Sequence, residues 1–399
     1  MTTDKLLDAT DQCVKCGLCL PHCPTYRLSR VEAESPRGRI SLVQGLVSGV
    51  LSPSERLDGH LASCLECRAC ESVCPSLVGV GSIMDQVYAQ RTLTLPPWRR
   101  QLRLGWLKSL GSPRLMRAAQ RLGALYRLVG GARLARRLGL SRLPLVNAYA
   151  RLAEGLQPPP RWEPQGAEGA EVALFLGCSS EVTQAGALEA AAQVLGRLGI
   201  PMVRPGWQGC CGAMLRHNGF PREADQRLQR NAAALGDRVL VGVASACVAE
   251  LRAHPGLAQA AELCAYLDAV SWPNGLNLSP LSADVLVHEP CSHRNQLGGN
   301  GAVHRLLARI PALRVAALPD NALCCGAAGT YLLQHPDTAL ALLEPKLAHL
   351  NRLRPSFLVT TNPGCALHLA AGAREAGLPI EVCHPVELIA RQLPPLGVR

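Results

Sequence analysis

Residues 13–24 read CVKCGLCLPHCP, and this stretch decides the fold of the N-terminal part of the chain. The same spacing returns at residues 64–75, which read CLECRACESVCP. Both stretches follow the pattern C-x2-C-x2-C-x3-C-P, whose thiolates hold iron–sulfur clusters. Two copies of the full pattern in one chain therefore predict two clusters and a protein that carries electrons.

The spacing also predicts which cysteines share a cluster. The first three thiolates of each stretch can surround one cubane, because a tight loop turns its side chains towards one point. The fourth cysteine lies beyond the loop, and in bacterial two-cluster ferredoxins it ligates the other cluster. We predict one 4Fe–4S cluster on Cys13, Cys16, Cys19 and Cys74. We predict the other on Cys64, Cys67, Cys70 and Cys23.

Zinc sites and disulfides are the alternatives for these cysteines. Zinc sites usually pair two C-x2-C units across a longer gap, without the triple run closed by Cys-Pro. Disulfides need an oxidising compartment, and the N-terminus does not resemble a signal peptide. The 18 cysteines thus indicate metal ligation in a reducing cytoplasm. No apolar run reaches the length of a membrane-spanning helix.

The net charge of +11 is concentrated in one segment. Residues 91–153 contain fourteen Lys or Arg and no Asp or Glu. Amphipathic helices are expected here, as in residues 115–129. One interpretation is a solvated helical spacer whose arginine stems cover apolar surface. The other is peripheral contact through 91–153 with an anionic membrane or an acidic partner. Nucleic acid is not expected, because no binding motif accompanies the charge.

Residues 171–399 contain an internal repeat. Segments 173–178, 209–212, 239–247 and 263–264 recur at offsets of 113, 114, 118 and 119 residues. In each copy, short β-branched runs that end at a cysteine alternate with Ala/Leu-rich helical stretches, which predicts parallel α/β units. Because ligands bind at the carboxyl ends of such strands, each copy should gather four thiols at one rim. The first set is Cys178, Cys210, Cys211 and Cys247, and the second is Cys291, Cys324, Cys325 and Cys365.

The fold class expected is α+β overall, with a helical two-cluster ferredoxin-like domain followed by a tandem α/β repeat. The boundaries expected are 1–90 for the ferredoxin-like domain and 91–170 for the basic connector with its linker. The repeats follow at 171–280 and 281–399.

The Cys-Cys-Gly turns at 210–212 and 324–326 indicate metal binding. Adjacent side chains normally diverge, and a glycine permits the positive φ that lets both thiols face one metal. A further iron–sulfur cluster and a zinc ion are both compatible with four thiolates, and small buried cysteines without metal are the third interpretation. Cys264 and Cys383, which stand singly in apolar runs, are expected to be buried hydrophobes.

These motifs together resemble the glycolate oxidase iron–sulfur subunit family. The resemblance rests on the two cysteine stretches, the turn at 35–39 (SPRGR), the two Cys-Cys-Gly units, and 323–331 (LCCGAAGTY) followed by His335-Pro336. It runs from about Cys13 to the C-terminus and is weakest in the basic connector.

The resemblance implies an electron-transfer subunit of a flavin-dependent glycolate or other 2-hydroxyacid oxidase. FAD-binding partner subunits would take the hydride, and this chain would pass electrons towards quinone. FAD is expected on the partner only, since no G-x-G-x-x-G follows a strand here. The chain is expected in the cytoplasm, including the cytoplasmic face of the inner membrane.

Two rivals remain. The same relay serves lactate or glycerol 3-phosphate in related families. A heterodisulfide-reductase-like thiol/disulfide oxidoreductase is the second, but there each unit ends in Cys-x-x-Cys. Here the matching residues are Glu250 and His368, so the fifth thiolate is missing from both units.

Overall fold

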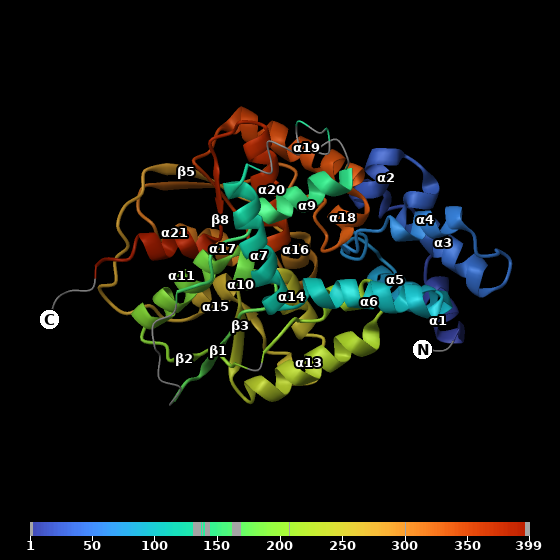
Figure 1. The fold of residues 1–399 in the computed structure, drawn as a ribbon, viewed down its shortest axis with the longest axis horizontal. Coiled ribbons are helices and arrows are strands. Elements are labelled where there is room, and N and C mark those ends of the chain that lie inside the picture. Colours follow the sequence, from blue (N-terminus) through green and yellow to red (C-terminus); the bar gives the residue numbers. More distant parts are fainter. Residues whose placement is uncertain are drawn as a thin grey trace.

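The computed structural model describes residues 3–130, 137, 139, 144–161, 169–206, 208–299 and 301–395. The N-terminal helices form one end of the molecule, and the two repeats with their parallel sheets form the remainder (Figure 1).

The N-terminal part is helical and has its own apolar core. Its α-helices are α1 (Thr3–Asp11), α2 (Pro24–Ser29), α3 (Pro36–Val47), α4 (Glu55–Ala62) and α5 (Val80–Thr94), with 3₁₀ turns η1 (Leu20–His22) and η2 (Glu32–Glu34). Leu6, Val43, Leu61 and Ile83 are almost fully buried between them. This core holds the two cysteine loops, which lie between α1 and α2 and between α4 and α5.

The basic connector continues as α6 (Pro97–Leu110), α7 (Pro113–Leu128) and α9 (Pro144–Glu154). The helix expected over 115–129 is therefore present, one residue shorter at its end. These helices pack on the repeats: α6 contacts α12 (Ala213–Arg216) and α9 contacts α20 (Pro363–Glu375). The connector thus covers the repeats on one side. The expected linker falls partly on 162–168, outside the described residues.

Each repeat contains a four-stranded parallel sheet. The first has the order β2-β1-β3-β4, with β1 (Val172–Phe175), β2 (Met202–Val203), β3 (Val239–Gly242) and β4 (Ala261–Glu262). The second has the order β6-β5-β7-β8, with β5 (Ala283–Val287), β6 (Leu313–Ala317), β7 (Phe357–Val359) and β8 (Glu381–Cys383). The identical order and direction confirm the tandem α/β repeat and the α+β class of the whole chain.

The helices of the repeats connect these parallel strands. In the first repeat they are α10 (Ser180–Thr183), α11 (Ala185–Arg197), α12, α13 (Pro221–Leu235), α14 (Ser245–Leu251), the 3₁₀ turn η4 (Pro255–Leu257) and α15 (Leu263–Ala269). In the second they are α16 (Cys291–Gln296), α17 (Gly301–Leu307), α18 (Tyr331–Gln334), α19 (Pro336–Leu353), α20 and α21 (Pro385–Arg391).

The two repeats pack through pairs of helices that are equivalent when the repeats are interchanged. The first repeat's α11 lies on the second repeat's α21, and α15 lies on α17, which is the same pairing with the repeats interchanged. The same holds for α14 with α16 and α10 with α20. The shared core contains fully buried apolar residues of both sheets, among them Leu174, Val241, Val285 and Val359. The pairing gives the two repeats a pseudo-twofold relation.

Among the described residues, no helix combines the length and the apolar character needed to cross a lipid bilayer.

Candidate iron–sulfur centres

The two cysteine loops have the same backbone conformation. The residues before and after the second cysteine of each loop have positive φ: Lys15 (56°) and Gly17 (87°) in the first loop, Glu66 (51°) and Arg68 (55°) in the second. Alternating right- and left-handed residues turn successive N–H groups inwards and form a concave anion site. Three of these residues are not glycine and cost about 1–2 kcal/mol each in this conformation. That strain is consistent with loops shaped to surround an anionic group.

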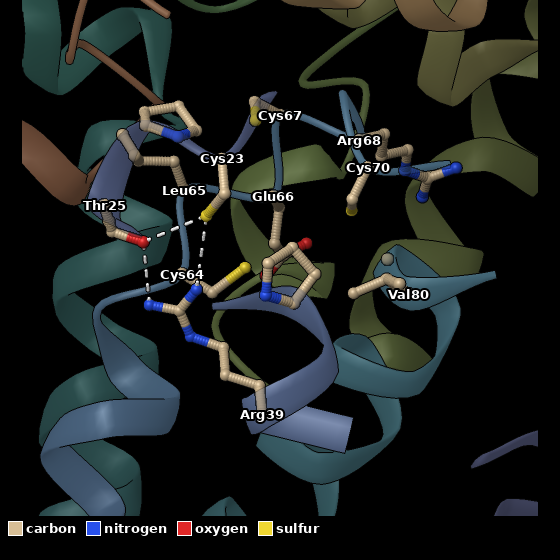
Figure 2. A pocket seen from close by; sticks show the side chains of 13 residues that line it. Cys23, Thr25, Arg39, Cys64, Leu65, Glu66, Cys67, Arg68, Cys70 and Val80 are labelled. Atoms are coloured by element: carbon tan, nitrogen blue, oxygen red, sulfur yellow. Dashed lines mark hydrogen bonds between the residues drawn. The ribbon is translucent and has the colours of Figure 1, made fainter. Parts of the chain in front are cut away.

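The second loop surrounds a cavity whose thiols include Cys23, Cys64, Cys67 and Cys70. Figure 2 shows these four side chains around it, with Cys23 contributed from the first motif. Burial raises the pKa of Cys64 to about 11 and also raises those of Cys67 and Cys70. Thiols so placed ionise readily only when a metal compensates the charge. The four residues fit a 4Fe–4S cluster.

The first loop surrounds a second cavity. Its lining includes Cys13, Cys16, Cys19 and, from the second motif, Cys74. The structure therefore brings together both sets of four that the spacing predicted. Cys70 lines this cavity as well as the other, so the two cavities adjoin.

Two arginines of the turn at 35–39 support the cavities. Arg37 donates to the Lys15 carbonyl (3.0 Å) and so fixes the first loop. Arg39 is fully buried and donates to Thr25 Oγ1 (3.1 Å) and to the His60 carbonyl (2.9 Å), beside the second cavity. Burial alone would lower the pKa of Arg39, but the charges of Cys64, Cys23 and Glu34 outweigh it and raise the pKa. Arg39 thus places a fixed positive charge next to the thiolates.

The four thiols of each repeat also come together. Each cysteine or cysteine pair follows a strand, and neighbouring thiols act on one another in the same order in both repeats. In the second set, Cys325 Sγ lies 3.2 Å from Cys365 Sγ. The neighbouring thiols hold the pKa of Cys210 and of Cys324 well below the ordinary value. The order in the first set is Cys178, Cys210, Cys211 and Cys247, and in the second Cys291, Cys324, Cys325 and Cys365.

The glycine of each Cys-Cys-Gly turn has the expected positive φ. Gly212 (103°) and Gly326 (91°) lie against the backbones of Ala224 and Ala339, in the first turns of α13 and α19. A Cβ at Gly326 would come within 2.5 Å of the Ala339 carbonyl oxygen. Glycine is therefore required both by conformation and by the close approach of the helix.

The second thiol set lies beside a ferredoxin-type loop. Leu65 and Cys67 pack in one apolar cluster with Cys324 and Cys291. The charges of Cys67 and Cys324 act on each other, and burial remains the largest cause of the raised pKa of Cys67. Asn295, near the end of α16, donates to the Cys67 carbonyl (2.7 Å). The helix that begins at Cys291 therefore also holds the Cys67 loop.

A half-buried ionic group joins the second loop to the first repeat. His217 Nδ1 lies 2.5 Å from Glu66 and 2.9 Å from Asp85 of α5. Burial opposes the charged imidazolium, but Glu66 and Asp85 outweigh it and raise the pKa of His217 well above its ordinary value. Burial raises the pKa of Glu66 to about 7.

Some residues near the centres were not identified from the sequence. The sequence indicated Arg37 and Arg39 only as part of the turn at 35–39, and no sequence pattern indicated Asn295. The repeat alignment offered one usable signal, a lysine in the second copy (Lys346) where the first copy has Asn231. Cys264 and Cys383 are buried as expected, but Cys264 lies in the first turn of α15 instead of a strand.

Comparison with known proteins agrees with this architecture. The chain matches the family model of the 4Fe-4S dicluster domain over residues 9–78 and that of the cysteine-rich domain over 172–252 and 285–370. It is 30% identical to the glycolate oxidase iron–sulfur subunit of Escherichia coli K12, over 98% of this chain and 96% of that protein. It is 27% identical to the probable glycolate oxidase iron–sulfur subunit of Bacillus subtilis 168, over 92% and 89%. Lactate utilization protein A of Oceanobacillus iheyensis is 24% identical over 55% of this chain.

Two adjoining four-cysteine cavities, followed by two cysteine-rich repeats, define an iron–sulfur electron-transfer protein of the oxidoreductases. The chain belongs to the glycolate oxidase iron–sulfur subunit family.

Proposed function

We propose that this chain is the electron-transfer subunit of a flavin-dependent glycolate oxidase complex. FAD-binding partner subunits oxidise the 2-hydroxyacid, and this chain passes the electrons towards quinone. The names of the two relatives aligned over most of the chain support the glycolate assignment. An equivalent subunit for lactate is the second candidate, supported by the lactate utilization proteins, which match about half of the chain.

One observation carries the relay: three thiol-lined sites lie in a continuous row. The cavity of the Cys13 set adjoins that of the Cys64 set through Cys70. The Cys64 set in turn meets the second repeat's thiols through Cys67 and Cys324. Clusters bound there would supply one-electron carriers, which split the electron pair of a reduced flavin. The protein's part is to hold these sites close together.

We propose the cluster ligands as the spacing predicted them. Cys13, Cys16, Cys19 and Cys74 hold one 4Fe–4S cluster, and Cys64, Cys67, Cys70 and Cys23 hold the other. The second repeat's four thiols hold a further iron–sulfur cluster, because they lie next to Cys67 of the second loop. For the first repeat's thiols, a zinc ion is the alternative to an iron–sulfur cluster.

We also propose that α6 and α7 rest on an anionic membrane surface, on the cytoplasmic face. On α7, Leu122 and Leu128 are more than half exposed, and Arg114 and Arg121 are exposed among them. Exposed apolar and basic side chains together favour the interface of an anionic bilayer. If this surface does not bind anionic lipid, contact with an acidic partner protein would replace the membrane proposal.

Anaerobic purification with partner subunits retained tests the function. Glycolate added to the complex should bleach the iron–sulfur absorbance, and lactate or glycerol 3-phosphate should do so more slowly. The chain purified alone should contain no FAD and should leave glycolate unoxidised. Stoichiometric FAD on the isolated chain, or turnover of a disulfide by it, would contradict the proposal.

A further inference from the structure

The two thiol sets are built alike but differ in the side chains beside them. The helices α13 and α19 align residue for residue, since the third residue after the leading proline, Ala224 or Ala339, meets the Cys-Cys-Gly glycine in both. The tenth residue after each proline is then Asn231 in the first repeat and Lys346 in the second. Both side chains are almost fully buried.

In the first repeat this position holds the loop through backbone contacts. Asn231 Oδ1 accepts from the Gly209 N–H (2.9 Å), and its Nδ2 donates to the Cys210 carbonyl (3.1 Å). Phe175, three residues before Cys178, packs with Cys211 in one apolar cluster. The side chains at these two positions are therefore uncharged in the first repeat.

In the second repeat the same two positions are polar. Lys346 is 2% exposed, and its Nζ donates to the backbone carbonyl of Asp320 (3.2 Å). His288, three residues before Cys291, offers a ring nitrogen within 4.8 Å of the thiols of Cys325 and Cys365. Lysine is almost never buried to this extent without a compensating negative charge. In the described residues Lys346 forms no ion pair, and the negative charges that act on it are those of the thiols and of Asp320. The Asp320 carboxylate is half exposed and already pairs with His349, so the thiols are the buried negative charge.

We propose that Lys346 is a positioning residue for electron transfer, whose buried ammonium compensates the negative charge of the cluster on the second thiol set. The proposal rests on the proposed function, in which that set holds the cluster. A reduced cluster carries one more negative charge than the oxidised one, so a cation beside it favours the reduced form. Net charge and burial are among the factors that set such potentials. Lys346 therefore raises the reduction potential of this cluster above that of the same ligands beside a neutral residue.

The pKa values agree with this arrangement. Burial lowers the pKa of Lys346, and the charges of the three thiols and of Asp320 oppose that change. The lysine thus keeps its proton most firmly when the neighbouring sulfurs are ionised, as they are when they bind a metal.

The test is a redox titration of the anaerobically purified full chain, followed by electron paramagnetic resonance. Lys346→Met removes the charge and keeps most of the stem, and Lys346→Arg keeps the charge. Asn231→Ala alters the equivalent position of the first repeat and is the matched control. We expect Lys346→Met to shift the midpoint of the second-set cluster downwards, while Lys346→Arg and Asn231→Ala stay near the wild type.

The outcomes separate this proposal from the function on which it rests. If the wild-type protein contained about eight irons and gave no third cluster signal, the second thiol set would hold no cluster and Lys346 would have none to act on. A third signal whose midpoint is unchanged in Lys346→Met would overturn the role of Lys346 alone. If Lys346→Met loses the cluster while Lys346→Arg retains it, the result supports the role of the positive charge. Loss of the cluster in both variants would overturn that role.

Discussion

At the residue scale, Cys23 and Cys74 each line the cavity that is formed mainly by the other motif. Cys23 is buried beside the second cavity, with Thr25 Oγ1 3.3 Å and Arg39 Nη1 3.9 Å from its sulfur. Cys74 lines the first cavity. Each centre therefore depends on both motifs, and neither motif completes a set of four alone.

Cys23→Ser should consequently damage the cluster of the Cys64 set and leave that of the Cys13 set. Electron paramagnetic resonance of the reduced variant measures this, with Cys383→Ser, a buried cysteine outside both cavities, as the control. Loss of only the signal assigned to the Cys13 set would show that the ligands do not cross.

Gly326→Ala should destabilise the second repeat more than an ordinary left-handed glycine replacement does. The added Cβ would meet the Ala339 carbonyl oxygen at 2.5 Å, whereas at Gly377 (φ 65°) it would meet no atom within 4 Å. We expect Gly326→Ala to lose about 1–3 kcal/mol more than Gly377→Ala, because overpacking forces the backbone apart. Denaturant unfolding of the two variants measures the difference, and equal losses would contradict the close approach.

Most of the cysteines that line the two cavities could be predicted from the sequence, because their spacing is a local property of the chain. The crossing of Cys23 and Cys74 followed from the pattern, and the cavity linings bring the same residues together. Arg39 and Asn295 could not be predicted, because their contacts join segments 21 and 228 residues apart.

At the scale of elements, the contact of α5 with the residue after α12 fixes the second loop on the first repeat. Asp85 of α5 and His217 face each other, with Glu66 of the loop on the same nitrogen. Hydrogen bonds and charge from His217 lower the pKa of Asp85 although burial opposes this. Asp85 and His217 are therefore both ionised between the lowered pKa of Asp85 and the raised pKa of His217.

This contact should lose stability as the pH rises. The folded-state pKa of His217 is raised, so its contribution is complete below about 6.5, its unfolded value, and disappears as the pH rises through the folded pKa. The contribution of Asp85 is complete above about 3.8 and is lost only in acid.

His217→Gln should thus flatten the decline of the melting temperature above pH 6.5. Melting curves at constant ionic strength measure it, with His254→Gln, on the first repeat and away from the loop, as the control. An unchanged pH profile in His217→Gln would contradict the ionic contact.

The repeat strands and most helices could be predicted from sequence periodicity. The packing of α6 and α9 against the repeats could not, because the segment reads as a basic amphipathic spacer until its partners are known. Its apolar stripe is buried on them at Leu104 and Leu107, while α7 keeps an exposed apolar side.

At the scale of the whole molecule, the excess charge and the exposed apolar residues share the α6–α7 surface. Replacing Arg114 and Arg121 with Gln should weaken binding to vesicles that contain anionic lipid, by about 1 kcal/mol per residue. Vesicle flotation measures it, with the exposed pair Arg222 and Arg230 of α13 replaced as the control. Equal binding of both variants would favour the spacer interpretation. Arg133 and Arg136, also basic in this segment, lie outside the described residues.

The row of three thiol-lined sites is the central feature of the molecule. It could not be predicted from the sequence, because both repeats contain the same four cysteines and neither is marked as the neighbour of a ferredoxin-type loop. The structure distinguishes them, since Cys67 meets the thiols of the second repeat and α16 holds its loop.

Magnetic coupling between neighbouring reduced clusters tests this row most directly. In the fully reduced chain, electron paramagnetic resonance should show the cluster of the Cys64 set broadened by a paramagnet at the second thiol set. Cys324→Ser should remove this broadening, and Cys210→Ser, its equivalent in the first repeat, should leave it. Broadening that survives Cys324→Ser, or that disappears in Cys210→Ser instead, would contradict the proposed order of the sites.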